Sequence, residues 1–423
     1  MAVRTLRVEG MREDTRGAEE RAALEAAESR PLDMSVEHVL DTARTRAGLD
    51  DFGPMDFTER LGALLREVEA DDNVWKTHKG LFVEQCVKAA SNRLYIRHYW
   101  TTHPASLDVP IDRPVNVIAL PRSGSTHLEN LVASDRRLRH LPVWLATQPA
   151  PNPHEDPGPG GADPRYARAE ERWARLSSNE IMAAMHEHSP DHACGENELQ
   201  IPDFASYQWE WMARVPGFRD HYLGTDQTPH YAYMRDVLKL IAHQFPDDRR
   251  WMLKSNQHAE QLGPLVSTYP DATIVMIHRD PVATLTSLLT MRGLALKTSQ
   301  RVPDIDAHVD YWVDRVERML RGYLRDRHLV PHDQLVEVDF ADMVADDVKT
   351  AAYVLDRAGL PVTGETTADI EAYIAAHPRG RRGRVVYDLA GDFGLDTAEL
   401  RERFAFYTDT VGIRPETGKG GSK

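Results

Sequence analysis

The sequence predicts an α/β protein in which a mainly parallel β-sheet is flanked by helices and preceded by an N-terminal helical extension. Three observations lead to this fold class. Apolar residues recur at helical spacing up to about residue 110, where no strand pattern is visible. Short β-branched runs then alternate with helical stretches, as in βαβ crossovers. The chain has 423 residues and is 41% hydrophobic, which allows two or three structural units with a core.

Residues 1–110 are assigned to the helical extension. The first 30 residues alternate charges with alanines, as a frayed or solvated helix does. Ser35 can cap the next helix, in which Val36, Val39, Leu40 and Ala43 share one face. Two further helices are expected over 57–70 and 80–99.

Residues 111–396 are assigned to the α/β core. Four apolar runs bounded by turn residues read as buried parallel strands, at 115–120, 250–255, 272–279 and 334–340. Residues 149–164 contain too much proline and glycine for regular structure and form a loop, which is a candidate lid. Residues 397–423 are expected to form a C-terminal helix and a disordered tail.

Composition excludes several classes of protein. The chain has 51 Lys and Arg against 66 Asp and Glu, a net charge of −15, which argues against nucleic-acid binding. Two cysteines, Cys86 and Cys194, make neither a disulfide scaffold nor a four-cysteine zinc site. No signal peptide or apolar run of about 20 residues is present. These observations predict a cytoplasmic protein without an integral membrane segment.

A candidate anion site follows the first strand of the core. The run Pro121-Arg122-Ser123-Gly124-Ser125-Thr126 lies between that strand and a helix start. Free helix amides and three hydroxyl groups would face a bound anion there. An ordinary βα turn with a serine cap is the alternative. The only Gly-Lys pair is Gly418-Lys419, so the nucleoside-triphosphatase motif is missing, and so is G-x-G-x-x-G.

The run PRSGST between strand and helix resembles the 5′-phosphosulfate loop of sulfotransferases that use 3′-phosphoadenosine 5′-phosphosulfate (PAPS). Further on, HRDP with Ser287 eight residues after Arg279 resembles that family's 3′-phosphate element. The block WMLKSNQH resembles the family's LKSPxH, with Asn256 in place of proline. The runs HPRGRRGR and VYDLAGDFGLD resemble its basic loop and its ending. The resemblance covers about residues 49–396.

This resemblance implies a P-loop-like fold and in-line transfer of a sulfuryl group from PAPS to a hydroxyl or amine of a small-molecule, lipid or carbohydrate acceptor, with no metal. Lys254 would neutralise the bridging oxygen of the donor. The residues implied in donor binding are Arg122, Ser123, Gly124, Ser125, Thr126, Arg279, Ser287, Arg381 and Arg382.

The general base has three candidates. His258 follows the strand that ends at Lys254, and histidine has a suitable pKa. Glu196 is the second, because some family members use a carboxylate, and His127 inside the loop is the third. Near Glu196, the run MHEHSPDHACGENE has zinc-ligand residue types, but its spacing matches no familiar site. We expect no metal there.

Two other functions remain open from the sequence. One is a P-loop small-molecule kinase, although the core of this chain lacks the Gly-Lys pair with which such kinases bind phosphate. The other is a non-catalytic nucleotide-binding module. A homodimer is also left open. The aromatic residues Phe204, Tyr207, Trp209 and Trp211 indicate core packing, with an acceptor-pocket wall as the alternative.

Overall fold

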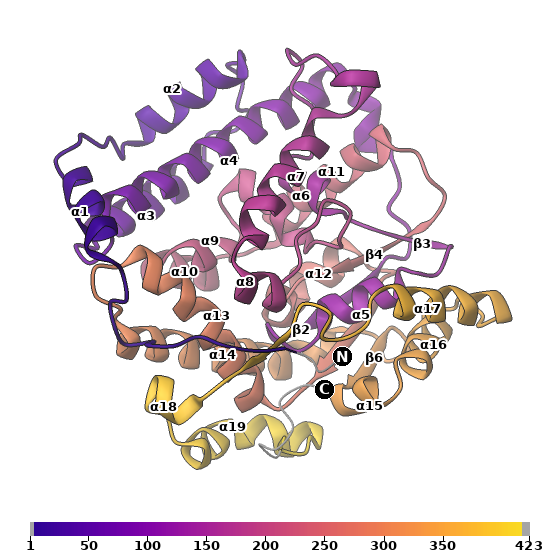
Figure 1. Ribbon diagram of the computed structural model, residues 1–423. Coiled ribbons are helices and arrows are strands. Elements are labelled where there is room, and N and C mark those ends of the chain that lie inside the picture. Colours follow the sequence, from indigo (N-terminus) through magenta and orange to yellow (C-terminus); the bar gives the residue numbers. More distant parts are fainter. Residues whose placement is uncertain (1–3, 417–423) are drawn as a thin grey trace.

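A five-stranded parallel sheet lies at the centre of the computed structural model, which describes residues 4–416 (Figure 1). The strand order is β3-β4-β2-β5-β6. The four predicted strands are confirmed, and the short β3 was missed. The strands are β2 (Val115–Ala119), β3 (Leu138–His140), β4 (Arg250–Lys254), β5 (Thr273–His278) and β6 (Leu335–Asp339). Because all five are parallel, the loops after β2, β4 and β5 leave the sheet at one edge, where α/β proteins bind ligands.

The two faces of the sheet are buried by different helices. Side chains alternate along a strand, so Val115, Val117 and Ala119 of β2 pack on one side while Ile118 packs on the other. The first face is covered by α5 (Ser125–Val132), α15 (Phe340–Ala345), α16 (Asp347–Arg357) and α17 (Gly364–Ala376). The second is covered by α11 (Thr228–Gln244), α12 (Leu262–Thr268) and α14 (Ile305–Asp326).

The N-terminal helices belong to the same hydrophobic cluster as the second face. Ser35 caps its helix as predicted, since its side chain accepts a hydrogen bond from the amide of His38. The predicted helix over 57–70 is confirmed, and that over 80–99 extends further in both directions. The elements are α1 (Ala18–Ala27), α2 (Val36–Ala47), α3 (Phe57–Ala70), α4 (Lys76–Thr102) and the 3₁₀ helix η1 (Pro104–Asp108).

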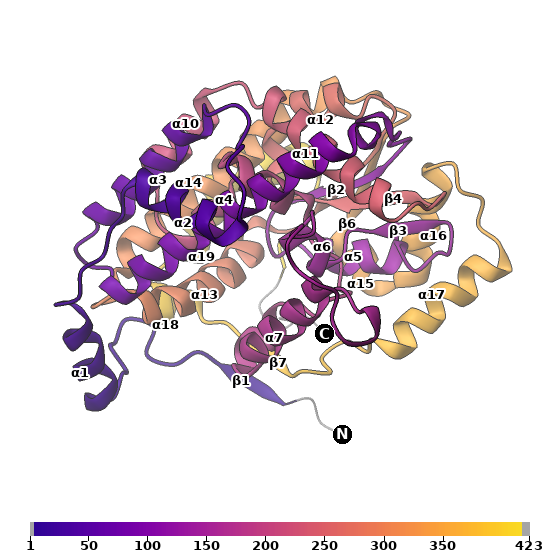
Figure 2. The same cartoon turned by 90° about the horizontal axis from the view of Figure 1, so that it is seen from above.

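The prediction that no strand precedes residue 110 is wrong. Residues Thr5–Arg7 form β1, which pairs in parallel with β7 (Arg384–Val386) near the other end of the chain. Figure 2 shows the two strands side by side. Three residues are too few for a visible alternation, and the partner that makes them a strand is distant in sequence.

The remaining elements connect the sheet to its covering helices. The predicted loop over 149–164 holds only the one-turn η2 (Pro159–Gly161), and the tail expected at the C-terminus falls mostly in residues 417–423, outside the described residues. No helix described is both long and apolar enough to cross a membrane. The other elements are α6 (Val143–Thr147), α7 (Pro164–Ser177), α8 (Glu180–Met185), η3 (Glu196–Asp203), α9 (Gln208–Met212), α10 (Pro216–Gly224), η4 (Gln257–Glu260), α13 (Pro281–Ser299), η5 (Arg327–Leu329), α18 (Leu389–Phe393) and α19 (Thr397–Val411).

Candidate functional site

The loop between β2 and α5 has a backbone that only a few residue types adopt. Arg122 has φ 71° and Gly124 has φ 80°, so both are left-handed. A Cβ on Gly124 would lie 2.8 Å from Cε of Met343 and 3.1 Å from the ring of Phe340, so a larger residue would also require these two side chains to shift. The hydroxyl of Ser123 is buried without a hydrogen-bond partner in the part of the chain that the structure describes. An orphaned buried hydroxyl beside the free amides of a helix start fits an anionic ligand.

Arg122, Arg279 and Ser287 lie together although the sequence separates them. Nη1 of Arg279 donates to the carbonyl of Arg122 over 2.7 Å. Nε of Arg122 donates to Oγ of Ser287 over 3.0 Å, and that hydroxyl donates to the hydroxyl of Tyr387 at 3.0 Å. Nη1 of Arg122 also donates to the carbonyl of Met185. The loop after β2, the end of β5 and helix α13 thus form one polar centre.

The guanidinium of Arg279 is engaged by a carboxylate from the C-terminal segment. Nε and Nη2 donate to the two oxygens of Glu416 over 2.7 and 3.0 Å. The amide of Glu416 donates to Asp280, and its carbonyl accepts from Arg401. Phe340 lies under the guanidinium, with 3.8 Å from its ring centroid to Cζ.

The basic loop before β7 is also paired with carboxylates. Arg381 donates to Glu187, and Arg382 lies 3.5 Å from the same carboxylate. Although burial raises the pKa of Glu187, the hydrogen bond from Arg381 brings it below its ordinary value. Arg382 also packs over the ring of Trp173. The two arginines predicted to bind a phosphate therefore converge on one anion position.

Lys254 ends β4 and is only 7% exposed. Within the described residues its ammonium group has no hydrogen bond or ion pair. The positive charge of Lys254 acts on Glu129 of α5. Both carboxylate oxygens of Glu129 are buried, and no donor among the described residues reaches them. Burial raises the pKa of Glu129 to about 8, and the charge of Lys254 opposes that rise.

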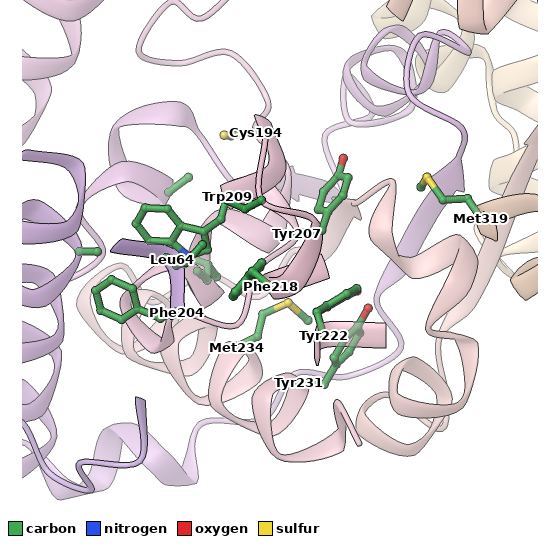
Figure 3. Close-up of a cluster of buried hydrophobic side chains, with 14 of the residues drawn as sticks. Leu64, Cys194, Phe204, Tyr207, Trp209, Phe218, Tyr222, Tyr231, Met234 and Met319 are labelled. Atoms are coloured by element: carbon green, nitrogen blue, oxygen red, sulfur yellow. The ribbon is translucent and has the colours of Figure 1, made fainter. Parts of the chain in front are cut away.

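His258 and Glu196 form a fully buried pair, with exposed fractions of 0%. Nε2 of His258 lies 2.8 Å from Oε1 of Glu196, and Nδ1 lies 2.7 Å from the hydroxyl of Tyr231. Tyr269 donates to the other oxygen of Glu196. Both ring nitrogens are therefore in use, and an acceptor would have to displace a partner to reach them. Figure 3 shows Tyr231 among the buried side chains of the hydrophobic core.

The segment that carries Glu196 packs on the end of β4. Oγ of Ser255 donates to Asn197 at 3.1 Å, and a Cβ on Gly195 would lie 3.2 Å from the carbonyl of Lys254. Glu198, in the same segment, is half-buried, and its carboxylate has no hydrogen bond among the described residues. Burial raises its pKa, while Arg172, Lys88 and Lys254 lower it.

Sequence reasoning missed Glu129, Glu198, Glu187 and Glu416. For Glu198 a signal existed, because the run GENE carries two carboxylates and only the first was considered. For Glu187 and Glu416 no local signal exists, since their partners lie far away in the sequence.

His127, the third candidate base, lies apart from the His258 pair. Its Nε2 is 2.9 Å from Oδ1 of Asp347 at the start of α16, which Arg379 also contacts. His186 and His188 belong to the run MHEHSPDHACGENE, which was weighed above as a zinc site. Their rings stack with centroids 4.2 Å apart, since the chain there is not helical. Among residues 4–416, no three metal-ligating side chains are grouped as for an ion.

Of the four aromatic residues, Phe204, Tyr207 and Trp209 are buried, and Trp211 is partly buried against the core. Phe204 and Trp209 stack face to face with centroids 5.2 Å apart and are fully buried, which confirms core packing for them (Figure 3). Trp211 is only half-buried.

Comparison with known proteins adds the family context. The family model described as the sulfotransferase family matches residues 114–364. The structure of sulfotransferase STF9 from Mycobacterium avium aligns with a TM-score of 0.80 and 22% identity, covering 92% of this chain and 99% of that one. Sulfotransferase STF1 from Mycobacterium tuberculosis H37Rv aligns with a TM-score of 0.72 and 26% identity, covering 88% and 98%. No curated protein sequence gives a significant match.

Proposed function

This chain belongs to the sulfotransferase family, and we propose that it moves a sulfuryl group from PAPS to a hydroxyl or amine of a small-molecule, lipid or carbohydrate acceptor. The observation that carries the donor assignment is the convergence of Arg279, Arg122 and Ser287, linked by bonds of 2.7 and 3.0 Å. Fixed cations and hydroxyls at one position suit a phosphate, and arginine forks suit it best.

The donor residues divide by the part of PAPS that they bind. The amides at the start of α5, with the hydroxyls of Ser123, Ser125 and Thr126, hold the 5′-phosphosulfate. Gly124 lets the backbone approach it closely, and Arg122 adds a charge. Arg279 and Ser287 hold the 3′-phosphate, and Arg381 and Arg382 close over it. The hydroxyl of Ser123, which is buried with no hydrogen-bond partner between residues 4 and 416, supports this division.

The transfer needs charge stabilisation and a route for one proton. The acceptor oxygen forms a bond to sulfur while the bond from sulfur to the bridging phosphate oxygen breaks. Negative charge builds on that oxygen, and the buried ammonium of Lys254, which has no ion pair among residues 4–416, stabilises it. The acceptor loses its proton to a base, and the products are the sulfated acceptor and adenosine 3′,5′-bisphosphate.

The base belongs to the group of side chains beside Lys254. His258 remains our first candidate. It would act with Glu196, whose Oε1 lies 2.8 Å from Nε2 of His258. Because both are fully buried, Glu198 becomes a further candidate: it is half-buried, unpartnered among the described residues, and in the field of Lys254. His127 is retained as the last candidate, since Asp347 occupies its Nε2.

Nucleotide binding tests the donor assignment. In a thermal-shift titration, adenosine 3′,5′-bisphosphate is expected to raise the melting temperature by mass action. ATP with Mg²⁺ giving the larger rise would favour the kinase alternative. Turnover of sulfur-labelled PAPS against a panel of alcohols and phenols separates an enzyme from a binding module and identifies the acceptor class.

Location and assembly belong to the same proposal. We expect a cytoplasmic enzyme that binds no nucleic acid, in keeping with two buried free thiols and a net charge of −15. Light scattering after size-exclusion chromatography decides between a monomer and a homodimer.

A further inference from the structure

Three charged side chains from α4, α7 and η3 lie near one another without forming a direct pair. They are Lys88, Arg172 and Glu198, and all three are half-buried. The charges of Arg172 and Glu198 act on Lys88, and the charges of both cations act on Glu198. None of the three side chains has a hydrogen bond or an ion pair within residues 4–416. We call these three residues the Lys88 cluster.

The C-terminal end of α6 connects the two helices that carry the cations. Asn92 of α4 donates to the carbonyl of the last residue of α6 over 2.9 Å. Arg168 of α7 donates to the side chain of Gln148, the next residue, also over 2.9 Å. Lys88 precedes Asn92 by one helical turn, so the two share a face of α4. Arg172 follows Arg168 by one turn on α7 in the same way, and η3 packs on both α4 and α6.

The Lys88 cluster has more positive than negative charge. The two other charged residues that act on Lys88, Arg168 and Glu84, are each engaged in an ion pair. Within the cluster, two cations therefore share the single carboxylate of Glu198. Burial, together with the charge of Arg172, lowers the pKa of Lys88 to about 8. An anionic ligand would offset the repulsion between the two cations.

Two stacked imidazole rings link the cluster to the transfer site. The rings of His186 and His188 have centroids 4.2 Å apart. The charges of Lys254 and Arg122 act on His186, and those of Arg172 and Lys254 act on His188. Burial lowers the pKa of both histidines, that of His188 to about 3, so both rings are neutral near pH 7. A row of polar groups thus runs from the phosphosulfate loop and Lys254, across the two rings, to Arg172 of the cluster.

We infer that the Lys88 cluster determines acceptor specificity, and that the acceptors are alcohols or phenols with an anionic group, which Lys88 and Arg172 bind. The inference rests on the proposed function for the role of acceptor, but not for binding. A guanidinium fork and an ammonium group both donate to carboxylate and phosphate oxygens. The ring of His188, which has no hydrogen bond among the described residues, would contact the acceptor between its anionic group and its hydroxyl. The hydroxyl then lies on the Lys254 side, where the sulfuryl group is transferred.

Calorimetry on the full chain, saturated with adenosine 3′,5′-bisphosphate, tests binding. The probes are 4-(hydroxymethyl)benzoate and 4-(hydroxymethyl)phenyl phosphate, with 4-methylbenzyl alcohol as the neutral counterpart. We expect at least one anionic probe to bind about tenfold more tightly than the neutral one, and the two anions to show whether carboxylate or phosphate is preferred. Lys88→Gln and Arg172→Gln should each reduce this preference about fivefold. Arg175→Gln removes an exposed charge from the same helix as Arg172 and should leave the preference intact.

Turnover tests the role of acceptor. With PAPS as the donor, the KM for the preferred anionic probe should rise about fivefold in Lys88→Gln and Arg172→Gln, with a smaller change in kcat. Two results overturn the inference: anionic probes that bind no more tightly than the neutral alcohol, or a preference that persists in both variants. An unchanged KM in both variants contradicts the role of acceptor. Failure of adenosine 3′,5′-bisphosphate to bind would instead contradict the donor assignment, and the probes would then be titrated into the nucleotide-free protein.

Discussion

The carboxylate of Glu416 holds the guanidinium of Arg279 in a bidentate ion pair of 2.7 and 3.0 Å. Arg279 is the residue proposed to bind the 3′-phosphate, so the C-terminal segment places a negative charge where the donor would bring one. Arg381 and Arg382 repeat the arrangement with Glu187. Donor binding then requires that these internal ion pairs open.

The first prediction concerns that competition. Glu416→Gln should tighten adenosine 3′,5′-bisphosphate binding about threefold to tenfold, because a partly exposed ion pair is worth about 1 kcal/mol. Calorimetry at low ionic strength measures it. Glu402→Gln removes the same charge from the exposed surface of α19 and should have no effect. Equal affinity in wild type and Glu416→Gln would show that the two anions do not compete.

The second prediction separates the two phosphates of the donor. Arg279→Ala should weaken the binding of adenosine 3′,5′-bisphosphate by about 1–3 kcal/mol, which is the contribution of one charge-assisted hydrogen bond. The same variant should bind adenosine 5′-monophosphate as tightly as the wild type does. Ser287→Ala should follow the same pattern more weakly, since Arg122 and Tyr387 also contact that hydroxyl. If Arg279→Ala weakened the binding of both nucleotides equally, Arg279 would contact another part of the nucleotide.

The third prediction concerns the base. His258→Ala should lower turnover about 10²–10⁴-fold while nucleotide affinity is retained, because the loss falls on the chemical step. Glu196→Gln and Glu198→Gln are measured alongside, with melting temperatures to detect unfolding, since the His258 pair is fully buried. An inactive Glu198→Gln with an active His258→Ala would transfer the role to Glu198. Activity in all three would leave His127 to be tested.

The fourth prediction is a pH dependence of stability. The pKa of Glu129 is raised to about 8 by burial, so the folded state holds a proton that the unfolded state releases near pH 4.5. The wild type therefore loses stability from this group as the pH rises from about 4.5 to 8. Glu129→Gln should match the wild type at pH 4.5 and exceed it by a few kcal/mol at pH 8.5, in chemical denaturation. A difference independent of pH would mean that Glu129 is ionised in the folded state.

The sequence predicted those parts of the fold that depend on local pattern. The buried strands were recognisable because their β-branched runs end in turn residues. Ser35 was recognisable as a helix cap because an N-cap serine bonds to an amide of its own helix. The β1–β7 pair was not recognisable, because each strand exists only through the other.

The same division applies to the site. The loop around Gly124 could be found from a six-residue motif, since its backbone geometry is local. The pairing of Arg279 with Glu416, and the burial of His258 between Glu196 and Tyr231, arise from tertiary contacts across the chain. Residue type and spacing identified the candidates there, but gave no information on which of their atoms are already occupied.

The pairing of β1 with β7 fixes the C-terminal end of the basic loop, which holds Arg381 and Arg382, to the N-terminal segment of the chain. Helix α17 anchors that loop on one side, and on the other Arg384 donates its amide to the carbonyl of Arg4 over 2.8 Å. A loop fixed at both ends has less conformational entropy to lose when it closes on a ligand. Without the β1–β7 pairing, the entropy cost of ordering the loop would reduce the free energy of donor binding. An enzyme trimmed at its N-terminus would then bind nucleotide more weakly with every phosphate-binding side chain still present.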